Sequence, residues 1–204
     1  MINIAVFASG RGSNFQAVHR KLSQMPDSPA QIALCVSNNP KPGAFEYAEA
    51  NGIPTCRVSP KMFPNDEAKY DREVQALLGS YHINLIVLAG YMRMLPPGVV
   101  SLYRGRILNV HPALLPDFGG QGMYGMNVHR AVIEAGREES GVTVHLVDEE
   151  YDTGAIVAQE RVPVLADDTA ESLAERVLHL EHDFYPRVIL KAAQRLSEGK
   201  GIID

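Results

Sequence analysis

Short apolar runs alternate with longer amphipathic stretches through most of the chain. The apolar runs, rich in Val, Ile and Leu, occupy residues 2–8, 32–37, 53–57, 83–89 and 106–110. Runs of this kind predict strands that are buried on both faces of a parallel sheet. The amphipathic stretches predict helices at residues 14–24, 42–51, 66–80, 96–103, 127–136 and 169–195. Strands that alternate with helices in this order predict a doubly wound α/β unit.

The pattern changes after Gly141. Residues 142–147 alternate between apolar and polar side chains, a polar turn follows, and residues 155–164 form a second extended run. Two such runs joined by a short turn predict an antiparallel strand pair. The expected fold class is therefore α/β, with a single Rossmann-like domain over residues 1–204. Its sheet is expected to be mostly parallel and flanked by helices, with the antiparallel strand pair in the C-terminal part.

Composition and charge narrow the possible partners. The chain has 204 residues, 46% of them hydrophobic, which is enough for one sizeable core. A net charge of −5 and the lack of a Lys/Arg cluster disfavour nucleic acid. No apolar run approaches membrane-spanning length, and the N-terminal run is interpreted as a strand rather than a signal peptide. Cys35 and Cys56 are too few for a disulfide framework or a zinc site, so we expect a reduced, cytoplasmic compartment.

A glycine-rich turn, SGRGSN at residues 9–14, lies between the first predicted strand and the first predicted helix. Backbone N–H groups and the helix dipole attract anions at such a place, and Ser13 and Asn14 can add donors or cap the helix. A tight turn that needs glycine for its backbone angles explains the same residues. Phe15 stands where a dinucleotide fingerprint has glycine, which disfavours NAD and leaves a monophosphate ester as a sensible ligand.

Asn109 and His111 lie two residues apart at the end of a predicted strand, so both side chains emerge on one face. Pro112 keeps His111 extended as the chain leaves the sheet, at the edge where open α/β sheets bind ligands. An amide donor stabilises a developing oxyanion and an imidazole moves protons near neutral pH, which suits acyl transfer. A histidine that merely caps the sheet edge is the alternative.

Asp152 lies in the turn of the predicted antiparallel pair. A carboxylate there can orient His111 and favour its protonated form, if the fold brings the two together. For His145, on the alternating run, a core or supporting role and a catalytic role both stay open. The histidines and carboxylates lack the spacing of a metal motif, and Ser9 and Ser13 do not form a nucleophile elbow. We therefore expect neither a metal nor a covalent intermediate.

Four segments together are specific enough to indicate a family. They are AVFASGRGSNFQA at 5–17, VLAGYMRML at 87–95, ILNVHPALLP at 107–116 and VTVHLVDEEYDTGAIVAQ at 142–159. With them the chain resembles, in order and over nearly its whole length, the folate-dependent formyltransferases, and among these the phosphoribosylglycinamide formyltransferases of purine synthesis. The resemblance implies that 10-formyltetrahydrofolate donates a formyl group to the amino group of glycinamide ribonucleotide, by direct transfer through a tetrahedral intermediate.

The resemblance also implies a role for each matching residue. The reaction centre would be formed by Asn109, His111 and Asp152. The acceptor would be bound by Gly12, Ser13, Asn14 and Glu181. The folate would be bound by Met92, Arg93, Met94, Leu95 and Asn109. Taken alone, Glu181 would be interpreted as an ordinary surface carboxylate of the last helix. The partners expected are thus two small molecules, bound by a monomer or a homodimer.

Two departures from the family pattern stand out. Residues 117–127 form a longer, glycine-rich segment where relatives have a short one, so we expect a mobile loop that differs in length from theirs. Glu67 aligns with a position where many relatives place an Arg near the folate tail, and Lys69 is the nearest substitute. The family further implies a cis peptide bond before Pro116.

Three hypotheses remain at this point. The first is transfer to glycinamide ribonucleotide; the second is another formyl-group enzyme of this fold, acting on methionyl-tRNA, on a nucleotide sugar or as a folate hydrolase; the third is a nucleotide-binding module without catalysis. The chain length and the acidic balance argue against the tRNA and sugar enzymes. The glycine turn favours a phosphorylated acceptor over hydrolysis, and the three predicted reaction residues disfavour a mere binding module.

Overall fold

A computed structural model describes residues 1–203 of the chain. The strands are β1 (Ile2–Phe7), β2 (Ala30–Ser37), β3 (Thr55–Arg57), β4 (Leu85–Leu88), β5 (Ile107–His111), β6 (Glu139–Leu146) and β7 (Ile156–Pro163). The helices are α1 (Ser13–Ser23), α2 (Gly43–Ala50), α3 (Glu67–Ser80), α4 (Pro97–Leu102), α5 (Met126–Glu134) and α6 (Ala170–Ser197), with a short 3₁₀ helix, η1, at Pro60–Met62.

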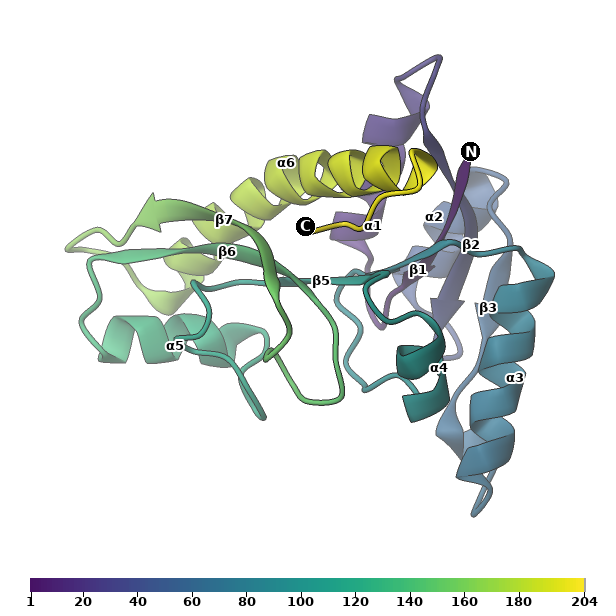
Figure 1. Ribbon diagram of the computed structural model, residues 1–204. Helices are drawn as coiled ribbons and strands as arrows, with labels where there is room; N and C mark the ends of the chain where they lie inside the picture. Colours follow the sequence, from purple (N-terminus) through teal and green to yellow (C-terminus); the bar gives the residue numbers. More distant parts are fainter. Residues whose placement is uncertain (204) are drawn as a thin grey trace.

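The seven strands form one sheet in the order β3-β2-β1-β4-β5-β6-β7 (Figure 1). Strands β1 to β5 pair in parallel, whereas β5 with β6 and β6 with β7 pair antiparallel. The chain order reverses direction at β1, where β2 and β4 lie on opposite sides. Open α/β sheets bind ligands at such a switch point, outside the carboxyl ends of the strands.

Two hydrophobic layers cover the sheet. Helices α1, α2, α5 and α6 pack on one face, and α3 and α4 pack on the other (Figure 1). Alternate residues of each central strand divide between these layers: in β1, Val6 belongs to the first cluster and Phe7 to the second, and both are fully buried. Burial on both faces is the reason that the strand sequences read as continuous apolar runs.

The 28-residue helix α6 crosses the sheet and is fixed at its start by a capping box. The Thr169 side chain accepts from the Ser172 amide, and the Ser172 hydroxyl accepts from the Thr169 amide, so two free N–H groups of the helix end are satisfied. Buried side chains follow along one face, among them Glu181 and Tyr185. A polar residue in that row indicates a function besides packing.

The predicted fold class is confirmed: the structure is an α/β fold with a mostly parallel sheet and the predicted antiparallel pair. Every predicted strand and helix is present, with ends displaced by a few residues. The run at 53–57 is strand only at Thr55–Arg57, and η1 was not predicted. Within residues 1–203, no helix is long and apolar enough to cross a membrane.

Candidate active site

The glycine turn connects β1 to α1 at the switch point of the sheet. Gly12 has a φ of +72°, and a Cβ there would lie 2.8 Å from the Cβ of Ala44 on α2. Both facts require glycine, so the turn is tight for steric reasons. No side chain caps α1, which removes the capping role considered for Ser13 and Asn14. The N–H groups of the first helical turn have no acceptor within the helix and are free to bind an anion.

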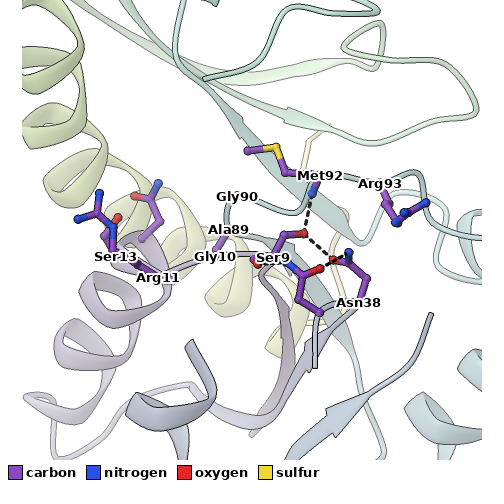
Figure 2. Close-up of a pocket in the computed structure, with 12 residues that line it drawn as sticks. Ser9, Gly10, Arg11, Ser13, Asn38, Ala89, Gly90, Met92 and Arg93 are labelled. Carbon is purple, nitrogen blue, oxygen red and sulfur yellow. Dashed lines mark hydrogen bonds between the residues drawn. The ribbon is translucent and has the colours of Figure 1, made fainter. Parts of the chain in front are cut away.

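A cavity of about 450 Å³ opens beside this turn (Figure 2). It is lined by Ser9, Gly10, Arg11, Gly12, Ser13, Asn14, Asn38, Asn39, Ala89, Gly90, Met92 and Arg93. The predicted phosphate-binding residues therefore lie together at one cavity. Its charged lining residues are the cations Arg11 and Arg93, which sequence analysis did not assign to the acceptor. Two cations and free backbone amides suit a phosphate group.

Ser9 joins three segments at the floor of this cavity. Its hydroxyl donates to Asn38 Oδ1 at 2.6 Å and accepts from the Met92 amide at 2.9 Å, as the dashed lines in Figure 2 show. The end of β1, the residues after β2 and the segment after β4 are thus held by one hydroxyl. Ser9 is 8% exposed, so its bonds form largely out of contact with water.

Asn14 is bonded to a carboxyl group from the other end of the chain. Its Nδ2 donates to Glu181 Oε2 at 2.5 Å, and both residues are buried. Burial raises the pKa of Glu181 to about 7, although the hydrogen bond from Asn14 lowers it. The interpretation of Glu181 as a surface carboxylate is therefore wrong. The acceptor residues implied by the family resemblance do lie together, because α6 crosses over α1.

Asn109 and His111 project from the same face of β5, as predicted from their spacing. Asn109 on β5 is the register partner of His145 on β6, and Asn109 Nδ2 lies 3.1 Å from His145 Nε2. His145 Nδ1 lies 2.8 Å from the carbonyl oxygen of Leu146, which can only accept, so this nitrogen carries the proton. In the neutral imidazole Nε2 is then the acceptor. One Asn109 N–H is bonded to His145, and the other is left for a ligand.

The turn between β6 and β7 carries Asp152 back to the end of β5. Asp152 Oδ2 lies 3.5 Å from His111 Nδ1, and Asp152 Oδ1 lies 3.5 Å from His145 Nε2. Asp152 has a φ of +58°, and two residues later Gly154 leaves no room for a Cβ against the Leu146 carbonyl. The predicted trio of Asn109, His111 and Asp152 is thus brought together, with His145 as the link.

The environment of this centre favours a neutral imidazole on His111 beside an ionised carboxylate on Asp152. Burial lowers the pKa of His111 and His145 lowers it slightly further, whereas the Asp152 charge and the Phe118 carbonyl raise it. Burial alone would raise the pKa of Asp152, but the neighbouring His145, the charge of His111 and the hydrogen bond from the Gly120 amide together hold it below its ordinary value. At neutral pH His111 is therefore mainly neutral and able to take up a proton.

A second, smaller cavity of about 70 Å³ lies beside Asn109 and Asp152. Arg93, Met94, Leu95, Asn109 and Asp152 are among its lining residues, with Tyr91, His145 and Tyr151. The predicted folate residues therefore flank the reaction centre, and Arg93 lines both cavities, while Met92 lines the larger one. Glu67 and Lys69, at the start of α3, line neither cavity, so the folate-tail contact remains a prediction.

The segment 117–127 covers His111 through its backbone. The Phe118 carbonyl accepts from His111 Nε2 at 2.8 Å, and the Gly120 amide donates to Asp152 Oδ2 at 3.0 Å. Contact through main-chain atoms does not depend on which side chains the segment carries. The preceding Leu115–Pro116 peptide bond is cis, in agreement with the family resemblance.

Besides Arg11, three parts of the site were not assigned from the sequence: His145, the Ser9–Asn38 contact and the Phe118 carbonyl. His145 was left between a core and a catalytic role, because the pairing of Asn109 with His145 depends on strand register. Backbone contacts from residue 118 have no side-chain signal at all. Within residues 1–203, no three His, Cys, Asp or Glu side chains are grouped so that they could hold a metal ion.

Comparison with known proteins identifies the family of the chain. The family model described as formyl transferase matches residues 2–189. A curated relative, phosphoribosylglycinamide formyltransferase, chloroplastic, from Arabidopsis thaliana, is 47% identical over 188 residues, which are 91% of this chain and 63% of that protein. Phosphoribosylglycinamide formyltransferase from Bacillus subtilis is 40% identical over 93% of both chains.

A solved structure of a similarly named protein has the same fold as this chain. The crystal structure of phosphoribosylglycinamide formyltransferase from Brucella melitensis superimposes with a TM-score of 0.85 at 43% identity, covering 94% of this chain and 95% of that one. The chain spans less than two thirds of the length of the two plant relatives it matches. Because the family match extends over most of the sequence, the chain belongs to the formyl transferase family.

Proposed function

We propose that the protein transfers the formyl group of 10-formyltetrahydrofolate to the amino group of glycinamide ribonucleotide. The products are formylglycinamide ribonucleotide and tetrahydrofolate, in de novo purine biosynthesis. The observation that carries the proposal is the trio of Asn109, His111 and Asp152, which come from two distant segments and meet at the smaller cavity, whose lining residue Arg93 also lines the larger one.

The larger cavity is assigned to the acceptor. Gly12, Ser13 and the first amides of α1 bind the phosphate, and Arg11 adds a positive charge. Asn14 belongs with Gly12 and Ser13 to the phosphate-binding turn, and Glu181, which is bonded to Asn14, binds the ribose. A phosphate held at this end places the far end of the acceptor, its amino group, toward Asn109.

The smaller cavity is assigned to the pterin end of the folate. The segment of Met92, Arg93, Met94 and Leu95 forms one wall, and its backbone N–H and C=O groups bind the ring edge. Asn109 also lines this cavity, so the formyl group of the donor reaches the carboxamide that is to stabilise it.

Transfer follows from the two substrates meeting at Asn109. The amine attacks the formyl carbon, and the free N–H of Asn109 donates to the oxygen as it becomes negative. His111 takes the proton that the amine loses at Nδ1, because Nε2 already donates to the Phe118 carbonyl, and returns it to the leaving folate nitrogen as the carbon–nitrogen bond of the donor breaks. Asp152 stabilises the imidazolium in between, at 3.5 Å from Nδ1.

The remaining assignments follow the same proposal. The whole of residues 1–204 acts as one formyltransferase domain, in the cytoplasm, on two small-molecule substrates. The proposal needs no metal, because proton transfer and oxyanion stabilisation are supplied by side chains.

An assay with 10-formyltetrahydrofolate, with and without glycinamide ribonucleotide, tests the proposal. Tetrahydrofolate should appear only when the acceptor is present, together with an equal amount of formylated ribonucleotide. Glycine amide without the ribose phosphate serves as the control acceptor and should react poorly, because the larger cavity then contributes no binding. Folate product without any acceptor would identify a hydrolase, and no product in either case would overturn the proposal.

A further inference from the structure

Tyr185 on α6 lies fully buried beneath the carboxyl ends of β4 and β5. Its hydroxyl oxygen is 3.0 Å from the carbonyl oxygen of Leu88 and 3.0 Å from that of Leu108. A phenol has a single O–H, so two neighbouring strands share one donor. Burial raises the pKa of Tyr185 well above its ordinary value, which keeps the hydroxyl protonated.

The two carbonyl groups lie where β4 and β5 separate. Pairing between these strands ends at Leu88 and Asn109, whereas β5 continues to His111 with β6 as its neighbour. The Leu108 carbonyl belongs to the peptide unit that leads into Asn109, and Leu88 is the register partner of Asn109. Both acceptors of the Tyr185 hydroxyl therefore flank the backbone of the same residue.

We propose that Tyr185 is a positioning residue, which fixes β4 against β5 where they separate and thereby holds the Asn109 carboxamide at the reaction centre. The assignment rests on the proposed function, since Asn109 is the group taken to stabilise the oxyanion. Transition-state donors need to be placed to within a fraction of an ångström, and a displacement of about 1 Å can cost about 100-fold in rate.

The same face of α6 also reaches the acceptor side of the site. Glu181, one helical turn before Tyr185, is the residue bonded to Asn14. One turn after Tyr185, Ile189 is fully buried in the core. Tyr185 therefore lies between the buried Ile189 and the hydrogen-bonded Glu181 on one face of α6, which restricts the movement of its hydroxyl.

The chain contains a matched control for this hydroxyl. Tyr103 is also buried, and its hydroxyl donates to the carbonyl of Ile83 at 3.3 Å. Ile83 precedes the amino end of β4, the edge of the sheet opposite the two cavities. Tyr103→Phe and Tyr185→Phe each remove one buried hydroxyl that donates to backbone, but only the Tyr185 hydroxyl lies beside Asn109.

Steady-state kinetics of the two variants distinguish positioning from simple structural support. We expect Tyr185→Phe to lower kcat by about tenfold or more, with KM for both substrates within about twofold of wild type. Tyr103→Phe should keep the wild-type kcat. Equal kcat values for the two variants, whether both reduced or both normal, would overturn the proposal.

A spectroscopic measurement separates this proposal from the proposed function. The side-chain ¹⁵N–¹H resonances of Asn109 should shift in Tyr185→Phe and stay in place in Tyr103→Phe, whether or not the protein transfers formyl groups. A wild type that lacks activity yet shows this shift would overturn the proposed function and leave the positioning intact. An active wild type with no shift in Tyr185→Phe would overturn the positioning alone.

A second substitution covers the case in which Tyr185→Phe does not fold. Replacing Tyr185 with 3-fluorotyrosine keeps the ring and the hydroxyl but makes the hydroxyl a stronger donor. The Asn109 side-chain resonances should then move relative to wild type. Resonances that stay unchanged would overturn the proposal.

Discussion

The Asp152 carboxylate lies 3.5 Å from the Nδ1 atom of His111, with both side chains almost completely buried. This contact joins the turn after β6 to the end of β5 and makes the pKa of His111 depend on the charge of Asp152. Burial lowers that pKa, and the negative charge partly opposes the lowering.

We therefore expect Asp152→Asn to move the acid limb of kcat/KM to lower pH. Removing the negative charge removes an influence that raises the pKa of His111, so the imidazole stays neutral to lower pH than in the wild type. The pH-independent value of kcat/KM should also fall, because the imidazolium formed during transfer loses its carboxylate partner. The measurement is a pH–rate profile of kcat/KM.

Asp117→Asn is the matched control, because Asp117 is an exposed carboxylate of the neighbouring loop and pairs with Arg137. Its profile should match that of the wild type. An acid limb that stays in place or moves upward in Asp152→Asn would contradict the assignment of Asp152.

His111→Ala should lower kcat by about 100-fold or more while the protein stays folded, since a positioned proton-transfer group is lost. Rates of formyl transfer and circular dichroism check the two parts of this prediction. His19→Ala is the control: this half-buried histidine on α1 contacts Tyr47 and lines neither cavity. A rate near that of wild type in His111→Ala would exclude His111 from the reaction.

Ser9→Ala should raise KM for the folate donor by about fivefold with little change in kcat. The substitution leaves the Met92 amide without its acceptor, and a hydrogen bond of this kind contributes about 1 kcal/mol, so the wall formed by residues 92–95 should loosen. Ser28→Ala provides the comparison, because the Ser28 hydroxyl also donates one hydrogen bond and accepts one from a backbone amide, but at the amino end of β2. If both variants changed KM equally, the effect would not arise at the folate wall.

Glu181→Gln should change how stability depends on pH. Burial raises the pKa of this carboxyl group from 4.5 to about 7, so the folded protein binds the proton more tightly than the unfolded chain does. The stability that this proton provides is complete below pH 4.5 and is lost as pH rises through 7, which lowers the free energy of unfolding by up to about 3 kcal/mol. Glutamine keeps an acceptor for Asn14 and removes the ionisation.

Urea unfolding at pH 5 and pH 8 measures this difference. The free energy of unfolding of Glu181→Gln minus that of wild type should be larger at pH 8 than at pH 5. Glu171→Gln, which replaces an exposed glutamate in the first turn of the same helix, should show no such change. A pH dependence identical to that of wild type in Glu181→Gln would mean that Glu181 ionises in the folded protein as it does in the unfolded chain.

The sequence predicted the elements of the fold because their periodicities are strong and local. The spacing of Asn109 and His111 likewise placed both on one face of β5 without reference to the rest of the chain. Asp152 joined them only through the family resemblance, since its contact depends on how the turn after β6 folds back. His145 depended on the register of β6 against β5, and Tyr185, an aromatic residue in a buried row, carried no sign that its hydroxyl reaches two strands.

The close packing of Gly154 against the Leu146 carbonyl has a consequence for how proteins of this shape can vary in length. An insertion between β6 and β7 would displace the glycine from that contact and carry Asp152 away from both imidazoles. The segment 117–127 approaches the same carboxylate only through main-chain atoms, which any sequence supplies. Residues can thus be gained or lost in the cover over the site far more readily than in the turn that supplies its carboxylate.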